Sequence, residues 1–214
     1  MEDDALLREL LANALEGQGF RVQTASNAAD AKRTFRNSDP DGIVLDIDLG
    51  AGPNGFDLAQ SILNEAPETG IVFLTQFPDA RFASLDTQEV PAGVAYLRKS
   101  ALSDLTRLYE ALDIAMRGNV GSEFRDDLDK HRPLAHLTRK QIQILKLMSM
   151  GQSNAQIAAS RGTTIKAVED AIRRAYIAIG VNADTENNTR TAAVAKFLSL
   201  SAVTDSTPTS TSPE

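Results

Sequence analysis

The first 117 residues alternate between two hydrophobic patterns. Apolar residues recur at helical spacing in four segments, residues 5–20, 27–38, 55–66 and 103–118. Four short strand-like runs stand between them, residues 21–25, 42–48, 70–75 and 94–99. This alternation predicts an α/β fold, a doubly wound parallel sheet with helices on both faces.

Local signals predict where several of these helices end. Gly17 and Gly19 close the first helical segment, and Pro67 closes the third. Asn27 is expected as the N-cap of the second helix and Ser103 as that of the fourth, because both side chains can accept from a free backbone N–H.

The second half of the chain has a different pattern. Residues 118–136 have no clear period and are rich in charge, so we expect a linker. Residues 137–200 read as helices with short breaks, which predicts a small all-α helix-turn-helix bundle. The tail is rich in Ser, Thr and Pro and is expected to be disordered. The expected domains are therefore residues 1–117, the linker 118–136, residues 137–200 and the tail 201–214.

Composition separates these parts further. Residues 1–117 carry 10 basic and 19 acidic residues, whereas residues 137–200 carry 9 basic and 4 acidic residues. The asymmetry favours two modules with different partners, the basic one a nucleic acid. The chain has no Cys and two His, so a disulfide or a zinc site is not expected. No apolar run is long enough to span a membrane, and we expect a cytoplasmic protein without a membrane partner.

Polar residues gather where the predicted strands end. Asp46 and Asp48 end one strand, Thr75 the next and Lys99 the last. The carboxyl ends of parallel strands meet at one edge of an open sheet, where ligands bind. Clustered carboxylates favour a hard cation such as Mg²⁺, and a carboxylate beside it can attack phosphorus. A hydroxyl and an ammonium group suit phosphoryl oxygens.

These stretches, together with the opening EDDALLREL, resemble the receiver domain of two-component response regulators, which has a flavodoxin-like fold. The resemblance implies that Asp46 accepts a phosphoryl group from a sensor histidine kinase, with Mg²⁺ as cofactor. The implied metal site comprises Glu2, Asp3, Asp46 and the carbonyl of Asp48. The implied phosphate-contacting and switch residues are Thr75, Lys99 and Tyr96.

The chain departs from the receiver pattern in three places. A receiver's acid pair follows a first strand in the middle of the sheet, whereas Met1 stands here where that strand should end. We hypothesise that the true start lies upstream; the alternative is a truncated receiver with an impaired metal site. The loop of residues 49–56 is one residue longer than usual, and Ser100 replaces a common Pro.

A rival interpretation is a haloacid-dehalogenase-like phosphohydrolase, whose opening motif also fits residues 43–50. Thr75 and Lys99 would fit its later motifs. That family needs a further acidic pair at a strand end, however, and Asp126 and Asp127 follow no apolar strand. We therefore expect no enzyme.

Residues 137–200 resemble the LuxR/NarL-type helix-turn-helix of bacterial transcription regulators. The expected core positions are Ile142, Leu145, Met148, Ile157, Ala158, Val168, Ile172, Ala175 and Ile179. The third helix would enter the DNA major groove. The candidate DNA-binding residues are Thr164, Lys166, Glu169, Asp170, Arg173 and Arg174, and further candidates for phosphate contacts are Arg139, Lys140 and Lys146.

Acids in the third helix leave two outputs open. Glu169 and Asp170 stand where the family usually has DNA-contacting residues, and acids oppose binding to phosphates. We expect a phosphorylated homodimer that controls transcription on double-stranded DNA. Val194, Phe197 and Leu198 are candidate dimer contacts, with core packing as the alternative. The alternative functions are a degenerate helix-turn-helix that binds a protein partner and a regulator that acts without phosphorylation.

Overall fold

The computed structural model describes residues 1–49, 53–83, 89–181 and 189–201. Residues 50–52 of the long loop, residues 182–188 before the last helix and residues 202–214 of the predicted tail lie outside the described residues. No helix in the described ranges is long and apolar enough to cross a membrane.

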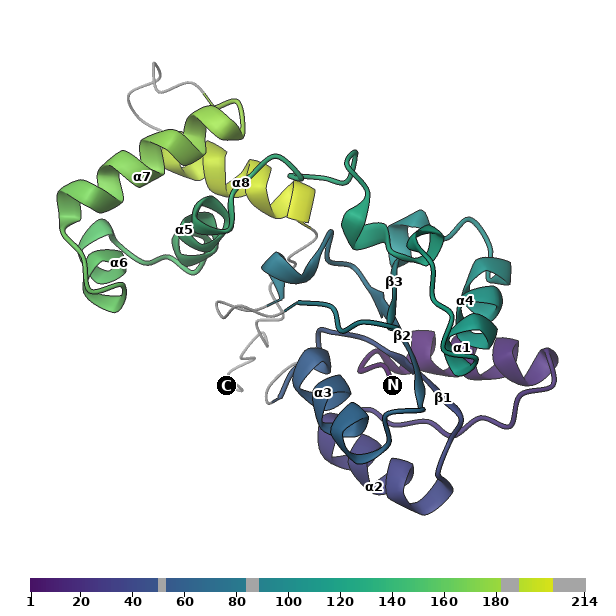
Figure 1. Cartoon of the computed structure of the whole chain (residues 1–214). Helices are drawn as coiled ribbons and strands as arrows, with labels where there is room; N and C mark the ends of the chain where they lie inside the picture. The colour runs from purple at the N-terminus through teal and green to yellow at the C-terminus, as the bar shows by residue number, and fades with distance from the viewer. Residues whose placement is uncertain (50–52, 84–88, 182–188, 202–214) are drawn as a thin grey trace, which may run out of the picture.

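The N-terminal part is built on a parallel sheet in the order β1-β2-β3 (Figure 1). Its strands are β1 (Gly42–Leu45), β2 (Gly70–Thr75) and β3 (Ala95–Arg98). All six residues of the middle strand β2 are buried, which explains its uninterrupted apolar sequence. In the register, Val44 lies opposite Val72 and Phe73 opposite Tyr96.

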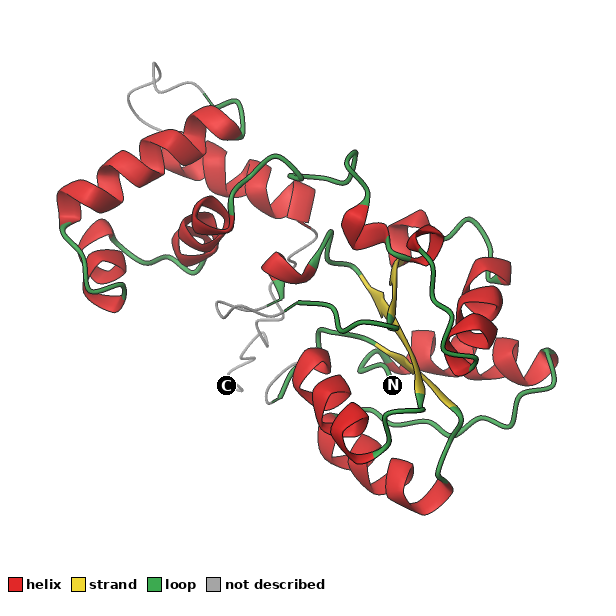
Figure 2. Cartoon of the chain, in the orientation of Figure 1, coloured by secondary structure: helices red, strands yellow, loops and turns green. Residues whose placement is uncertain are grey.

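Helices cover both faces of this sheet, as the alternating pattern predicts (Figure 2). One layer contains α1 (Ala5–Gly17) and α4 (Thr106–Met116), and the other contains α2 (Ala28–Ser38) and α3 (Gly55–Glu65). Burying one large apolar side chain stabilises the fold by about 1.5–3 kcal/mol, and each layer buries several. This packing fixes the three strands, so the side chains that follow their carboxyl ends lie at one edge of the sheet.

Met1 and Glu2 begin a ladder on the free edge of β1. The backbone nitrogen of Met1 donates to Val44 O at 2.5 Å, and Asp46 N donates to Met1 O at 3.0 Å. On the other side, Glu2 N donates to Ala25 O at 3.3 Å. The prediction of a strand at residues 21–25 is wrong. Among the described residues, the bond from Glu2 N to Ala25 O is the one backbone hydrogen bond that joins this segment to the edge of the sheet.

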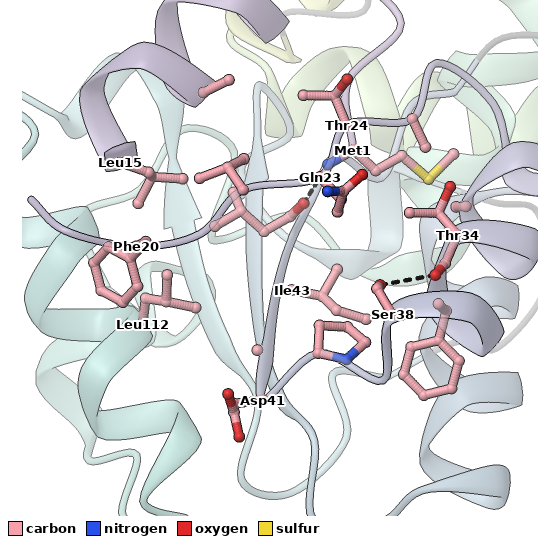
Figure 3. Close-up of a pocket in the computed structure, with 18 of the residues that line it drawn as sticks. Met1, Leu15, Phe20, Gln23, Thr24, Thr34, Ser38, Asp41, Ile43 and Leu112 are labelled. Carbon is pink, nitrogen blue, oxygen red and sulfur yellow. Dashed lines mark hydrogen bonds between the residues drawn. The ribbon is translucent and has the colours of Figure 1, made fainter. Parts of the chain in front are cut away.

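A cavity of about 320 Å³ lies beside this short ladder (Figure 3). Leu15, Ile43 and Leu112 line it from three different elements, and the extended residues 21–25 form another wall. The described residues do not test the hypothesis of a strand before Met1, which stays a hypothesis.

The predicted helix caps are confirmed in one case and wrong in the other. Asn27 Oδ1 accepts from Asp30 N at 2.9 Å and so caps α2. Ser103 does not cap α4. The neighbouring carboxylate of Asp104 accepts from Thr106 N at 2.8 Å instead, and α4 begins at Thr106.

The described residues of the C-terminal part form four helices. They are α5 (Arg139–Ser149), α6 (Asn154–Ser160), α7 (Ile165–Ala178) and α8 (Thr189–Ser201). All nine core positions predicted from their spacing are buried. Side chains of Thr138 and Ser153 cap α5 and α6, which fixes the entry of each helix.

The segment expected as a linker docks on the sheet before it reaches the helical part. It forms two short turns, η3 (Ser122–Phe124) and η4 (Asp126–Leu128). The Asp126 carboxylate accepts from Arg98 N at 2.8 Å, at the end of β3. The charge-rich sequence of this segment therefore serves buried ion pairs, and the exact division at residues 117 and 137 stays a prediction.

Candidate functional site

Lys99 joins two buried carboxylates at the carboxyl edge of the sheet. Its Nζ donates to Asp46 Oδ2 at 2.6 Å and to the two Glu2 carboxylate oxygens at 2.9 and 2.7 Å. The Glu2 and Asp46 side chains are each 5% exposed and that of Lys99 is 16% exposed. These three groups meet as predicted from the sequence, because Asp46 and Lys99 follow the ends of β1 and β3, and Met1, directly before Glu2, is hydrogen-bonded to the edge of β1.

Burial dominates the electrostatics of this cluster. It raises the pKa of Asp46 above its ordinary value, although Lys99 acts in the opposite direction. Burial likewise raises the pKa of Glu2. For Lys99, burial lowers the pKa, but the charges and hydrogen bonds of Asp46 and Glu2 outweigh it, so the pKa is raised. The single positive charge of Lys99 thus does not fully offset the cost of burying the two carboxylates.

Glu2, Asp3 and Asp46 can bring oxygen atoms together as a metal site. One carboxylate oxygen from each lies within 4.8 Å of the others, and Asp3 is exposed to solvent. An all-oxygen, acidic and partly open donor set fits Mg²⁺, which prefers oxygen ligands and keeps several waters. The Asp48 carboxylate is exposed and lies outside this group; its backbone N donates to Asp46 Oδ1 at 3.1 Å. The predicted role of the Asp48 carbonyl stays a prediction.

Thr75 and Tyr96 both hold one residue in the loop after β2. The Thr75 hydroxyl accepts from Phe77 N at 3.3 Å, and the Tyr96 hydroxyl donates to Phe77 O at 3.0 Å. Both side chains are fully buried. Burial raises the pKa of Tyr96 well above its ordinary value, so its hydroxyl stays a donor. The two predicted switch residues are therefore connected through Phe77.

The predicted DNA-binding residues lie on α7 and at its start. Thr164 caps the helix by accepting from Ala167 N at 3.2 Å. Lys166, Glu169, Arg173 and Arg174 are exposed, as a binding face requires. Asp170 is half-buried and lies 3.4 Å from the Arg173 guanidinium, which neutralises part of the helix face.

Known proteins resemble the chain both in its N-terminal part and over most of its length. Residues 1–100 match the response regulator receiver domain family. The oxygen regulatory protein NreC of Staphylococcus aureus is 25% identical over 183 residues, covering 78% of this chain and 83% of NreC. The NreC of Staphylococcus haemolyticus is 25% identical over 161 residues, covering 69% of this chain and 73% of the relative. Residues 1–100 belong to the response regulator receiver domain family.

Solved structures show a similar fold over nearly the whole chain. RcsB from Salmonella enterica serovar Typhimurium bound to promoter P1flhDC has a TM-score of 0.53 and 19% identity, covering 92% of this chain and 96% of RcsB. A structure of two RcsB dimers bound to two parallel DNAs has a TM-score of 0.52 and 20% identity, with the same coverage. The receiver and the helix-turn-helix part thus follow a shared architecture.

A second charged cluster in the structure was not predicted from the sequence. Asp79 is a buried carboxylate that accepts from Arg81 Nη2 at 2.6 Å and from Arg132 Nε at 2.7 Å. The signal available in the sequence was an acid and a base two residues apart within the otherwise apolar run of residues 77–83. The partner Arg132 is 53 residues away and carries no such signal.

Two other predictions on the helical part change with the structure. Lys146 was expected to be available for phosphates, but its Nζ donates to Phe82 O of the receiver at 3.0 Å. Phe197, a candidate dimer contact, is fully buried and its ring stacks on Phe82 of the receiver, so in this structure it packs within the chain. Val194 and Leu198 are half-buried, and their role in a dimer stays a prediction.

Proposed function

We propose that Asp46 accepts a phosphoryl group and that Glu2, Asp3 and Asp46 hold Mg²⁺ beside it. The observation that carries the proposal is the contact of Lys99 with Asp46, a nucleophilic carboxylate and a phosphate-binding ammonium 2.6 Å apart at a strand end. A bound divalent cation would neutralise charge on the carboxylates and on the phosphoryl oxygens.

The chain's own groups fit an in-line transfer from a histidine kinase or a small phosphodonor. An Asp46 carboxylate oxygen attacks phosphorus and forms a P–O bond, while the bond to the donor breaks and its electron pair leaves with the donor. Lys99 then moves its hydrogen bonds from the carboxylate to the phosphoryl oxygens. Thr75, at the end of the neighbouring strand, offers a hydroxyl to the same group. The product is an aspartyl phosphate and not a released metabolite, as expected of a regulator without turnover.

The test is phosphoryl uptake. The chain is incubated with Mg²⁺ and acetyl phosphate, and its intact mass is recorded. Wild type should gain one phosphoryl group and Asp46→Asn should gain none. Asp48→Asn is the matched control, because it removes an exposed carboxylate two residues away and should retain uptake. Equal uptake by Asp46→Asn and wild type would overturn the proposal.

For the output, we propose that a homodimer binds double-stranded DNA through α7 and controls transcription. Exposed Lys166, Arg173 and Arg174 supply positive charge on that helix, and RcsB, with the same fold, is described as bound to promoter DNA. Binding should weaken steeply with salt, because cationic contacts release counterions from DNA.

The second candidate is a protein partner for α7. The ion pair between Asp170 and Arg173 favours it, because it removes one cation from the face that would meet phosphates. Absence of DNA binding in both phosphorylation states at low salt would support this candidate. Binding to DNA without any phosphoryl uptake would instead support the phosphorylation-independent regulator.

The phosphohydrolase alternative has little support. Asp126 pairs with Arg107 at 2.7 Å and Asp127 with Arg125 at 2.8 Å, in the docked segment after α4. Within the described residues, neither carboxylate joins the acidic group around Asp46. Hydrolysis of a generic phosphate ester is therefore not expected.

A further inference from the structure

The receiver contacts the helical domain through a short segment that follows β2. This segment contains the turn η1 (Ala80–Phe82), which packs on α5. The Phe82 ring stacks on the Phe197 ring of α8 with centroids 5.9 Å apart, and both side chains are fully buried. Lys146 of α5 donates to the Phe82 carbonyl. The contact therefore covers α5 and α8, whereas the outer face of α7 is exposed.

A buried charge cluster fixes this segment to the chain that leads into α5. The Asp79 carboxylate accepts from both Arg81 and Arg132, and Arg132 belongs to the segment before α5. Arg81 also donates to the carbonyls of Leu134 and Leu137. Burial alone would raise the pKa of Asp79, but the hydrogen bonds from Arg81 and Arg132 lower it below its ordinary value. Asp79 is thus ionised at neutral pH and attracts both guanidinium groups.

The same segment begins at the residue held by Thr75 and Tyr96. Their hydroxyl groups fix the two sides of the Phe77 peptide backbone, and Asp79 follows two residues later. A movement of Thr75 toward a phosphoryl group would remove the hydrogen bond to Phe77 N. Any shift of Phe77 would reach Asp79 through two peptide units. The charge cluster is therefore connected to the carboxyl edge of the sheet through Phe77.

We propose that residues 77–82 form an interdomain clamp, in which Asp79 holds the helical domain through Arg132 and Arg81. The clamp keeps Lys146 and Phe197 covered and leaves α7 uncovered. Its release frees a cation on α5 and an aromatic side chain on α8. Regulation then acts on these two helices and not on access to the recognition helix. The dependence on phosphorylation rests on the proposed function, whereas the clamp itself does not.

The experiment measures the distance between the two domains in the full chain. The sequence has no Cys, so Gln18→Cys on the receiver and Ala159→Cys on α6 give two unique sites for spin labels. Both positions are exposed and lie outside the contact. Pulsed electron paramagnetic resonance should give one narrow distance distribution for the unphosphorylated protein.

Opening the clamp should broaden this distribution. Asp79→Asn and, separately, Arg132→Gln are expected to lower the ratio of closed to open molecules on the order of 10-fold, within the usual range of such couplings. Arg132→Gln leaves the Asp79–Arg81 contact in place, so it remains informative if Asp79→Asn folds poorly. Asp113→Asn is the matched control, because it breaks an exposed pair with Arg117 on α4 and should leave the distribution unchanged.

The outcomes separate the clamp from phosphorylation. A narrow, unchanged distribution in both folded variants would overturn the clamp. Broadening in the variants, with phosphoryl uptake confirmed by mass and the same broadening in phosphorylated wild type, supports the whole proposal. Broadening in the variants without broadening on confirmed uptake overturns the coupling to Asp46. Broadening in the variants without any uptake supports the clamp and contradicts the proposed function alone.

Discussion

The Lys99 ammonium lies 2.6 Å from the Asp46 carboxylate, although the two residues are 53 positions apart in the sequence.

 The Glu2 carboxylate accepts from the same ammonium, so one cation serves two buried acids. Together with exposed Asp3, the cluster keeps an excess of negative charge at the edge of the sheet. The predictions below follow from this excess and from the close packing around it.

Removing the cation should destabilise the receiver. Lys99→Met leaves Glu2 and Asp46 buried without their shared partner, and the free energy of unfolding should fall by about 3–5 kcal/mol, because breaking a buried ion pair is costly. Urea unfolding at neutral pH measures it. Arg33→Met, which breaks an exposed pair with Asp30, is the control and should cost less than about 1 kcal/mol. Equal losses in the two variants would contradict the buried network.

The pKa of Glu2 gives a pH dependence of known sign. Burial raises this pKa in the folded protein, so the folded state binds a proton more tightly than the unfolded state. The ionised side chain therefore opposes folding at neutral pH, and this penalty disappears as the pH falls toward 4.5, the ordinary value.

Glu2→Gln removes that titration. The difference in stability between the variant and wild type should favour the variant more at neutral pH than at low pH. It should shrink steadily as the pH falls. Thermal unfolding of both proteins across this range provides the measurement. An advantage that grows toward low pH would show that the sign is wrong.

Magnesium should stabilise the folded chain through the acidic group. A cation that binds only the folded state raises its stability by about 2.7 kcal/mol at 100 times its dissociation constant. Asp3→Asn should reduce the shift in melting temperature, because it removes one of the three carboxylates. Asp48→Asn keeps its backbone carbonyl and should retain the shift. The same shift in wild type and in Asp3→Asn would exclude the assigned ligands.

Gly55 is expected to be essential for the packing around Asp46. A Cβ at this position would lie 2.3 Å from the Asp46 carbonyl oxygen and 2.7 Å from Ile47 Cα, so the backbone itself would have to move. Gly55→Ala should lower the free energy of unfolding by about 1–3 kcal/mol, as overpacking does, and should slow phosphoryl uptake.

Gly17 provides the comparison for that substitution. A Cβ there meets nothing within 4 Å, and its φ lies outside the left-handed region, so Gly17→Ala should be neutral or slightly stabilising. Chemical unfolding of the two variants side by side separates a steric effect from a general effect of replacing glycine. A neutral Gly55→Ala would contradict the packing described here.

The sequence predicts the carboxyl-edge cluster well, because strand ends are marked by local patterns. Asp46 follows one apolar run and Lys99 follows another, and parallel pairing brings such ends together. The core of the helical part is equally predictable, since Val168, Ile172 and Ala175 follow helical spacing.

The contacts between the two parts could not be predicted in the same way. Asp79 and Arg132 lie in segments without a period, and their pairing depends on how two finished domains meet. Ser103 was a reasonable cap by type, but the adjacent Asp104 competes for the same backbone N–H. The strand at residues 21–25 failed because strand formation depends on a partner ladder, which local sequence does not encode.

The central claim is that Asp46 itself carries the phosphoryl group, and mapping the modified residue tests it most directly. After incubation with acetyl phosphate and Mg²⁺, borohydride reduces an aspartyl phosphate to homoserine, which peptide mass spectrometry locates. We predict homoserine at position 46 and at no other acidic position. Homoserine at Asp3 or Asp48 with none at position 46, or no homoserine after confirmed phosphoryl uptake, would contradict the account.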